Sequence, residues 1–401
     1  MRNIFTIIAF FLCAVTLHAQ DEPKKSMEIY GFIMMDAGYN FDQIHPDWYD
    51  VVRPTKLPTV ENQYGTDGNT YFSVRQTRLG FKNYFDTPMG ELKTQFEFEM
   101  FGTGVDAGQT TMRLRHAYAE LGKFGVGQTW SPFMDIDVFP NTVEYWGPTG
   151  MAFYRNVQIR YMPIQGDTRL TFALERPGAS ADQGPYSDRI PDDLAPRFPL
   201  PDLSFEYRHA AKFGYVEIAG IARSIQWEDT DTTDGNDFSD EVLGWGLNLS
   251  TNLKFGKSTV FRGSVLYGEG VENYMNDAPE DIGVEVNSDG TLEGVALPVT
   301  GISAFIDHNW NDKFSTAIGY SMIDIDNSNG QSDDAFSKGQ YIAANLMYYP
   351  VKNAMMGVEL QWGDRTNFNT GADPDLIDAS ITKIQFSFKY NFSEIFYKKN
   401  Q

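Results

Sequence analysis

The chain has 401 residues, with 32 lysines and arginines against 54 aspartates and glutamates, which gives a formal net charge of −22. A balance this acidic argues against a nucleic-acid-binding protein, which needs a basic surface for phosphates. The single cysteine, Cys13, excludes an internal disulfide and a zinc site built from several cysteines.

The N-terminus predicts a secretory signal peptide over residues 1–19. A short positive start is followed by an apolar stretch from Ile4 to Leu17, and Ala19 offers a small residue for cleavage. Residues 20–27 would then form a short periplasmic lead. Beyond residue 19 no run of 18 apolar residues occurs, so the chain has no candidate transmembrane helix. A membrane could otherwise be crossed only by a closed β-barrel, because lipid offers no partners to open strand edges.

Alternation of apolar and polar residues, the period of a β-strand, recurs along nearly the whole chain. Clear examples are residues 383–392, 356–362 and 92–100. A soluble all-β protein also alternates, so the connections decide between the two. Short turns here alternate with long polar loops, which is typical of an outer-membrane barrel with periplasmic turns and external loops.

The sequence therefore predicts an all-β fold, a 16-stranded antiparallel transmembrane barrel over residues 28–392, followed by a polar tail at 393–401. An even strand count is usual for bacterial barrels, and sixteen strands leave room for an aqueous channel. The expected strands are 28–39, 71–85, 91–102, 110–121, 124–130, 153–162, 168–176, 202–211, 214–226, 241–253, 258–268, 297–308, 312–325, 339–349, 353–363 and 379–392.

An ordered set of short motifs lies between residues 70 and 160. The set runs Gln76-Thr-Arg-Leu-Gly-Phe81, Gly90-Glu-Leu, Phe96-Glu-Phe-Glu99, Arg113-Leu-Arg-His-Ala-Tyr118 and Val126-Gly-Gln-Thr-Trp-Ser-Pro-Phe-Met-Asp135. It resembles the DcaP-like family of trimeric outer-membrane porins. The resemblance implies a 16-stranded barrel, a homotrimer in the outer membrane of a Gram-negative bacterium, and small organic anions such as dicarboxylates as solutes. Known members can carry a periplasmic helical extension, which residues 20–27 are too short to provide.

The loop at 131–152 is the candidate constriction. It is unusually apolar and aromatic for an exposed loop, so we expect it to fold into the barrel lumen. It carries Asp135, Asp137 and Glu144. A loop that packs over the barrel mouth, or against a neighbouring subunit, is the alternative.

Strand alternation places a group of cations on the opposite wall of the lumen. The inward positions are Arg78, Lys82, Arg113, Arg115 and Arg160. Charged patches set the selectivity of pores, and the planar arginine fork suits carboxylates. The inward acids Glu97 and Glu99 lie between these cations, so structural ion pairs are the alternative for each arginine.

Most of the excess acid falls in outer loops, at 228–241 and 269–296. We interpret these loops as solvated surfaces, or as sites where divalent cations bridge to lipopolysaccharide phosphates. The stretch 229–237 resembles a calcium loop but lacks its closing glutamate. No cofactor is otherwise expected.

The predicted function is a porin for small hydrophilic solutes that favours organic anions. A non-specific or cation-preferring porin and a structural or adhesive barrel are the alternatives. An enzyme is not expected, because His116, although predicted to face outward, has no neighbouring serine nucleophile. Polar outward residues instead suggest a subunit interface on the second to fourth strands, at Thr77, Asn83, Thr94 and His116.

Overall fold

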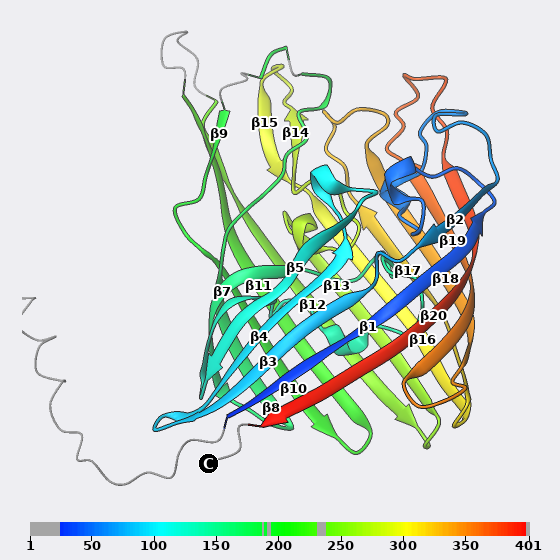
Figure 1. Ribbon diagram of the computed structural model, residues 1–401. Helices are drawn as coiled ribbons and strands as arrows, with labels where there is room; N and C mark the ends of the chain where they lie inside the picture. The colour runs from blue at the N-terminus through cyan, green and yellow to red at the C-terminus, as the bar shows by residue number, and fades with distance from the viewer. Residues whose placement is uncertain (1–24, 187, 191–193, 231–237, 398–401) are drawn as a thin grey trace, which may run out of the picture.

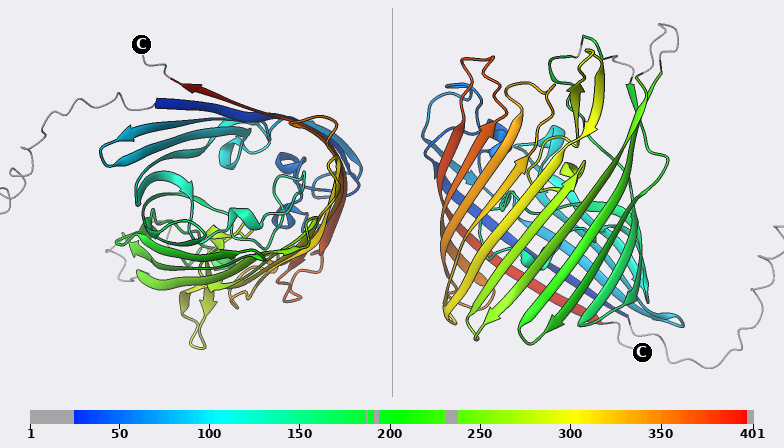
Figure 2. Two further views of the ribbon diagram at one scale, coloured as in Figure 1. Left: turned by 90° about the horizontal axis from the view of Figure 1, so that it is seen from below. Right: turned by 180° about the vertical axis from the view of Figure 1, so that it is seen from behind.

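A single antiparallel sheet closes on itself in the computed structural model, which describes residues 25–186, 188–190, 194–230 and 238–397. Strand β1 (Lys25–Asn40) pairs with β20 (Ala379–Tyr397) on one side and with β3 (Arg78–Thr87) on the other. Sixteen strand positions form the wall (Figures 1 and 2), so the predicted fold class is confirmed. The predicted signal peptide at 1–19 lies outside the described residues.

The wall is completed by strands of very different length. Two of its positions are interrupted, because β2 continues the line of β3 beside β1, and β9 continues the line of β10 beside β11. The bounds are β2 (Asn69–Ser73), β4 (Gly90–Phe101), β5 (Thr110–Leu121), β6 (Phe124–Trp130), β7 (Arg155–Ile164), β8 (Thr168–Glu175), β9 (Leu194–Arg197), β10 (Asp202–Ala211), β11 (Gly214–Asp229), β12 (Asp240–Phe255), β13 (Thr259–Glu269), β16 (Pro298–Asn311), β17 (Phe314–Ile325), β18 (Phe336–Tyr348) and β19 (Ala354–Asn367).

Outside the wall, the structure holds one hairpin and several single-turn helices. The hairpin pairs β14 (Ile282–Val286) with β15 (Leu292–Ala296). The 3-10 turns are η2 (Pro46–Trp48), η3 (Pro54–Lys56), η4 (Gly104–Asp106), η5 (Ile136–Val138), η6 (Gly184–Tyr186) and η7 (Glu272–Tyr274). Within the described ranges, none of the helices has the length and apolar character to cross a membrane.

The connections follow the predicted rhythm, with tight turns at one end of the barrel and long loops at the other (Figure 1). Most predicted strands match the observed ones to within a few residues. One difference is the predicted strand 71–85, which is broken into β2 and β3 because Arg75 and Gln76 turn inward to bind Asp50 and Asp36. Another is the last strand, which continues past Phe392 to Tyr397 in register with the start of β1.

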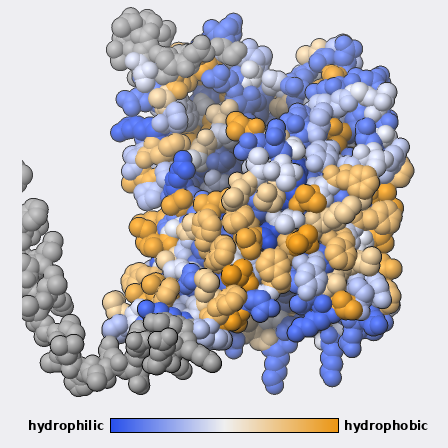
Figure 3. Space-filling view, viewed as in Figure 1, coloured by the Kyte–Doolittle hydropathy of each residue, from blue (hydrophilic) through white to orange (hydrophobic). Residues whose placement is uncertain are grey.

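Alternation along each strand sorts apolar side chains outward and polar ones inward. On β20, Phe386 is 54% exposed on the outer face, whereas Lys383 and Gln385 are fully buried on the inner face. The front of the molecule shows the result as an apolar band between two hydrophilic ends (Figure 3). A membrane-facing barrel requires this pattern, because lipid penalises exposed polar groups.

A β-bulge on β5 changes which side chains face the lumen. Glu97 of β4 pairs with His116, but Phe98 pairs with Leu114, so Arg115 is an extra residue in the ladder. An extra residue shifts the alternation by one. His116 therefore faces inward, where Thr129 Oγ1 lies 3.0 Å from its Nδ1. The outward position predicted for His116 is wrong, and so is its assignment to a subunit interface.

The bulge predicts that the side chain of Tyr118 faces the lumen and that of Ala117 faces outward. Because the alternation is shifted, a cysteine replacing Tyr118 should face the water-filled lumen, and one replacing Ala117 should face outward. A charged, water-soluble thiosulfonate should change the single-channel current of the Tyr118→Cys variant and leave that of Ala117→Cys unchanged. The reverse pattern would mean that β5 has no bulge.

Candidate functional site: an arginine-lined constriction

The segment between β6 and β7 lies inside the barrel, as the prediction for 131–152 required (Figure 2, left). Its first anchor is Asp135, which is 2% exposed. The Asp135 carboxylate accepts hydrogen bonds from Arg208 at 2.5 Å and from Tyr215 and Ser250, each at 2.6 Å. These bonds fix the start of the loop against the wall formed by β10, β11 and β12.

A second anchor holds the middle of the loop against β19. The backbone N–H groups of Val143 and Glu144 donate to the Glu359 carboxylate at 3.0 and 3.1 Å. The buried Glu144 carboxylate in turn accepts from the backbone N–H of Val52 at 3.0 Å and from that of Gly147. Burial raises the pKa of the Glu144 carboxyl to about 7, while Lys383 and the backbone donors act in the opposite direction.

The loop between β1 and β2 also packs into the lumen, which the sequence interpretation missed. Its Trp48 and Leu57 join Phe101 and Tyr341 in one buried apolar cluster. The guanidinium of Arg53 lies between two indoles, 4.0 Å from the ring of Trp48 and 4.0 Å from that of Trp146. Trp146 belongs to the loop 131–152, which we call the constriction loop. The apolar residues within 48–57, which lie in an otherwise polar connection, could have indicated that this loop packs into the barrel.

Four arginines from three strands surround two buried carboxylates on the facing wall. Glu99 lies 2.5 Å from Arg113, 2.7 Å from Arg115 and 3.2 Å from Arg78. Glu97 lies 2.6 Å from Arg115 and 3.6 Å from Arg78. The fourth guanidinium, Arg155 at the start of β7, is 3.8 Å from Glu99. We call Arg78, Arg113, Arg115 and Arg155 the arginine cluster.

The constriction loop touches the arginine cluster through Tyr145. The Tyr145 hydroxyl is hydrogen-bonded to both Arg113 and Glu99. Its ring stacks on Phe101 with 4.0 Å between centroids and 13° between planes. The loop residue that contacts the arginine cluster is therefore a phenol, Tyr145, and not one of the loop acids Asp135, Asp137 and Glu144.

The remaining predicted cations, Lys82 and Arg160, have no carboxylate within ion-pair distance among the described residues. Lys82 lies 4.5 Å above the ring of Tyr30. Arg160 donates to Gln158 and to the backbone carbonyl of Trp130.

Two inward cations close to the arginine cluster were not predicted, in addition to cations elsewhere in the lumen such as Lys383 and Arg208. Arg155 had been placed in its expected strand without a role, and Lys389 lies 4.1 Å above the ring of Phe32, which Arg78 also approaches at 5.1 Å. Alternation alone places Lys389 inward, so the signal was present in the sequence.

Asp137 differs from the other two loop acids because its side chain is 53% exposed. It pairs with Arg208 at 2.5 Å and lies 3.9 Å from Arg169. The three acids thus contact the far wall or the loop itself. No group of acidic, histidine or cysteine residues in the described chain is arranged to hold a metal ion. The calcium-like stretch 229–237 falls largely outside the described residues.

A family model described as DcaP outer membrane protein matches residues 17–392. The chain belongs to the DcaP outer membrane protein family. The protein is thus an outer-membrane channel of the porin type, located in the outer membrane of a Gram-negative bacterium. No curated protein sequence matches the chain significantly.

Solved structures with the same fold include several channels. The outer membrane channel DcaP of Acinetobacter baumannii aligns with a TM-score of 0.74 and 19% identity, covering 94% of this chain and 100% of that one. The anion-selective porin from Comamonas acidovorans gives a TM-score of 0.57 and 11% identity, over 92% and 100%. The trimer form of Vibrio cholerae OmpT gives 0.56 and 13%, over 93% and 100%. At these identities the likeness shows the fold alone.

The raised pKa of Glu144 predicts a pH-dependent stability. A carboxyl whose pKa is raised in the folded state favours folding while protonated, so this contribution is lost as the pH rises from about 4.5 to about 7. Relative to wild type, Glu144→Gln should gain about 3 kcal/mol of unfolding free energy across that window. Urea unfolding of both proteins from lipid vesicles at several pH values measures the gain. A difference that does not change with pH would contradict the prediction.

Proposed function

We propose that this porin carries small organic anions, such as dicarboxylates, in preference to cations. The observation that supports the proposal is the arginine cluster, in which four guanidiniums share only two carboxylates, Glu97 and Glu99. Four positive charges against two negative ones leave a net positive wall beside the constriction loop. Such a charged wall favours counter-ions in a pore.

Two members of the arginine cluster are accessible to a solute. The side chains of Arg78 and Arg113 are 23% and 20% exposed, whereas that of Arg115 is only 4% exposed. Arg78 and Arg113 would therefore bind the solute carboxylate, and Arg115 would hold Glu97 and Glu99 in place. Arginine binds carboxylates through two parallel hydrogen bonds, which adds orientation to attraction.

Three further cations that have no carboxylate within ion-pair distance among the described residues extend this positive path. Lys389 and Arg78 both lie near the ring of Phe32. Lys82 is on β3 with Arg78, and Arg160 is on β7 with Arg155. Several weak sites in succession let a solute enter and leave. The acidic outer loops oppose anion entry, but charges more than about 8 Å away are largely screened at physiological ionic strength.

Ion selectivity tests the proposal directly. Changing Arg78 and Arg113 together to glutamine should move the reversal potential in a salt gradient from anion preference toward cation preference. The matched control changes Lys212 and Lys257, two lysines in exposed turns, to glutamine and removes the same charge. It should leave the reversal potential unchanged. A cation-selective wild type that the double variant does not alter would favour the alternative, a cation-preferring or non-specific porin.

We also infer that this porin is a homotrimer. Strands β6 and β8 have only 7 and 8 residues. A tilted transmembrane strand needs about 9–11 residues to cross the hydrocarbon core. β6 and β8 are therefore too short to span the membrane where they would face lipid directly. The outer face of β3 and β4 also holds a polar pair, with Asn83 donating to Thr94 at 3.1 Å. A neighbouring subunit would cover both features, and outer-membrane lipid and lipopolysaccharide would contact the remaining surface.

Crosslinking locates the subunit interface. With a bifunctional maleimide, a cysteine replacing Thr94 should give covalent dimers and trimers on a denaturing gel. A cysteine replacing Leu360, which is 53% exposed on the apolar outer face of β19, should give monomers. Multimers from Leu360→Cys alone would place the interface at β19 instead of at β3 and β4.

A further inference from the structure

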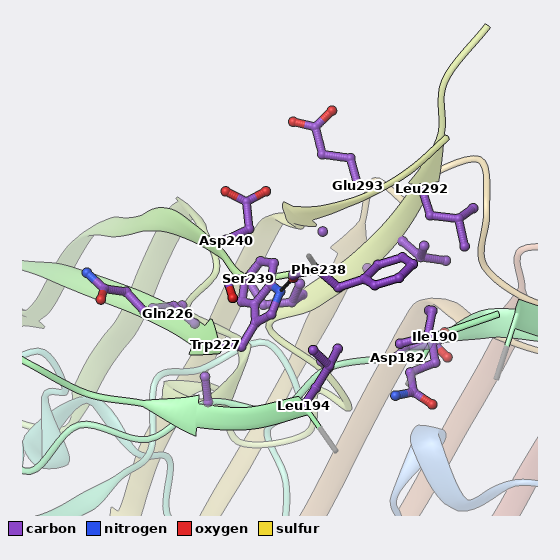
Figure 4. A pocket seen from close by; sticks show the side chains of 18 of the residues that line it. Asp182, Ile190, Leu194, Gln226, Trp227, Phe238, Ser239, Asp240, Leu292 and Glu293 are labelled. Atoms are coloured by element: carbon purple, nitrogen blue, oxygen red, sulfur yellow. Dashed lines mark hydrogen bonds between the residues drawn. The ribbon is translucent and has the colours of Figure 1, made fainter. Parts of the chain in front are cut away.

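A cavity of about 790 Å³ lies among the outer loops, away from the constriction (Figure 4). Its walls are the loop that contains β9, the upper ends of β11 and β12, and the β14–β15 hairpin. Backbone contacts join these segments, because Ala181 pairs with Ile282 in a parallel bridge and Asp182 N–H donates to the Ile282 carbonyl at 2.8 Å. The volume is in the range of pockets that hold small molecules.

Apolar side chains converge in this cavity. Leu194, Trp227, Phe238 and Leu292 come from four different segments and all line this cavity (Figure 4). The Trp227 indole is held in place, because its Nε1–H donates to the Phe238 carbonyl at 2.8 Å and Gly294 leaves room for the ring. An apolar site on an external loop surface gains free energy when an apolar body displaces water from it.

The charged residues that line the same cavity are mostly acidic. Asp182, Asp240, Asp289 and Glu293 face a single cation, Arg189. Arg189 is engaged, since it donates to the Gly290 carbonyl at 2.8 Å and lies 5.5 Å from the Tyr186 ring. In the described part of the chain, none of the four acids has a lysine or arginine within ion-pair distance. A net negative rim thus surrounds an apolar interior.

We propose that this cavity binds a small organic ammonium ion that carries an apolar or aromatic body. The apolar body would bury against Leu194, Trp227 and Phe238, and the ammonium would lie near Asp240 and Glu293 at the rim (Figure 4). A tryptophan face adds attraction for a cation. An anionic ligand of the same shape would be repelled, so this site has the opposite charge preference to the arginine cluster and does not depend on it.

Isothermal titration calorimetry with phenylbutylammonium tests the proposal, with the full-length channel in detergent and empty micelles as the blank. Phenylbutyrate, which has the same apolar body and the opposite charge, is the comparison probe. Phenylbutylammonium should bind with one-to-one stoichiometry, and phenylbutyrate should bind at least about tenfold more weakly. Equal binding of both probes, or no binding of phenylbutylammonium, overturns the proposal.

Rim variants separate this cavity from a general effect of negative charge. Asp240 and Glu293 are exposed, so changing them to asparagine and glutamine should not disturb folding. The double variant should bind phenylbutylammonium about fivefold more weakly. Changing Asp67 and Glu61, which are exposed on another loop, to asparagine and glutamine removes the same charge and should leave the affinity unchanged. Equal weakening by both double variants would overturn the assignment to the cavity.

Channel recordings keep this proposal distinct from anion transport. The Asp240→Asn, Glu293→Gln variant should retain the conductance and reversal potential of wild type, because the arginine cluster is intact. Conversely, the Arg78→Gln, Arg113→Gln variant should bind phenylbutylammonium with wild-type affinity. Loss of binding in the arginine variant would place the ammonium site in the lumen and overturn its assignment to the outer loops.

Discussion

The two buried carboxylates Glu97 and Glu99 organise the lumen of this channel. An arginine in a low-dielectric wall is costly unless its charge is balanced and its donors are bonded. Two carboxylates can hold four guanidiniums in fixed positions, but they cannot neutralise them. The same contacts that give the cluster its rigidity therefore leave the excess positive charge on which the proposed anion preference rests.

In the constriction loop, too, some residues fix the structure and another residue contacts the arginine cluster. Two of its acids attach the loop to its surroundings and do not face the solute path. Asp135 binds Arg208, and Glu144 accepts hydrogen bonds from backbone N–H groups. Tyr145 is the loop residue that meets the arginines. A phenol can share a hydrogen bond with Arg113 without cancelling its charge, so the loop narrows the lumen beside the cluster while the positive field persists.

Two regions of opposite net charge occur in the described part of the molecule. The outer loops are rich in acid, and their cavity has an apolar interior with a negative rim, whereas the arginine cluster has more positive than negative groups. The overall charge of −22 therefore does not describe the arginine cluster, where four guanidiniums meet two carboxylates.

The sequence by itself determined the barrel, because a period of two and the spacing of short and long connections are local properties of the chain. It also placed Arg78, Arg113 and Glu99 on the inner face by alternation. Only the tertiary structure determined the position of the bulge and the packing of the constriction loop, because strand alternation contains no information about either. The bulge at Arg115, which turns His116 inward, depends on register with β4. The docking of the constriction loop depends on partners such as Glu359, which is more than two hundred residues away in the chain, so no local pattern could reveal it.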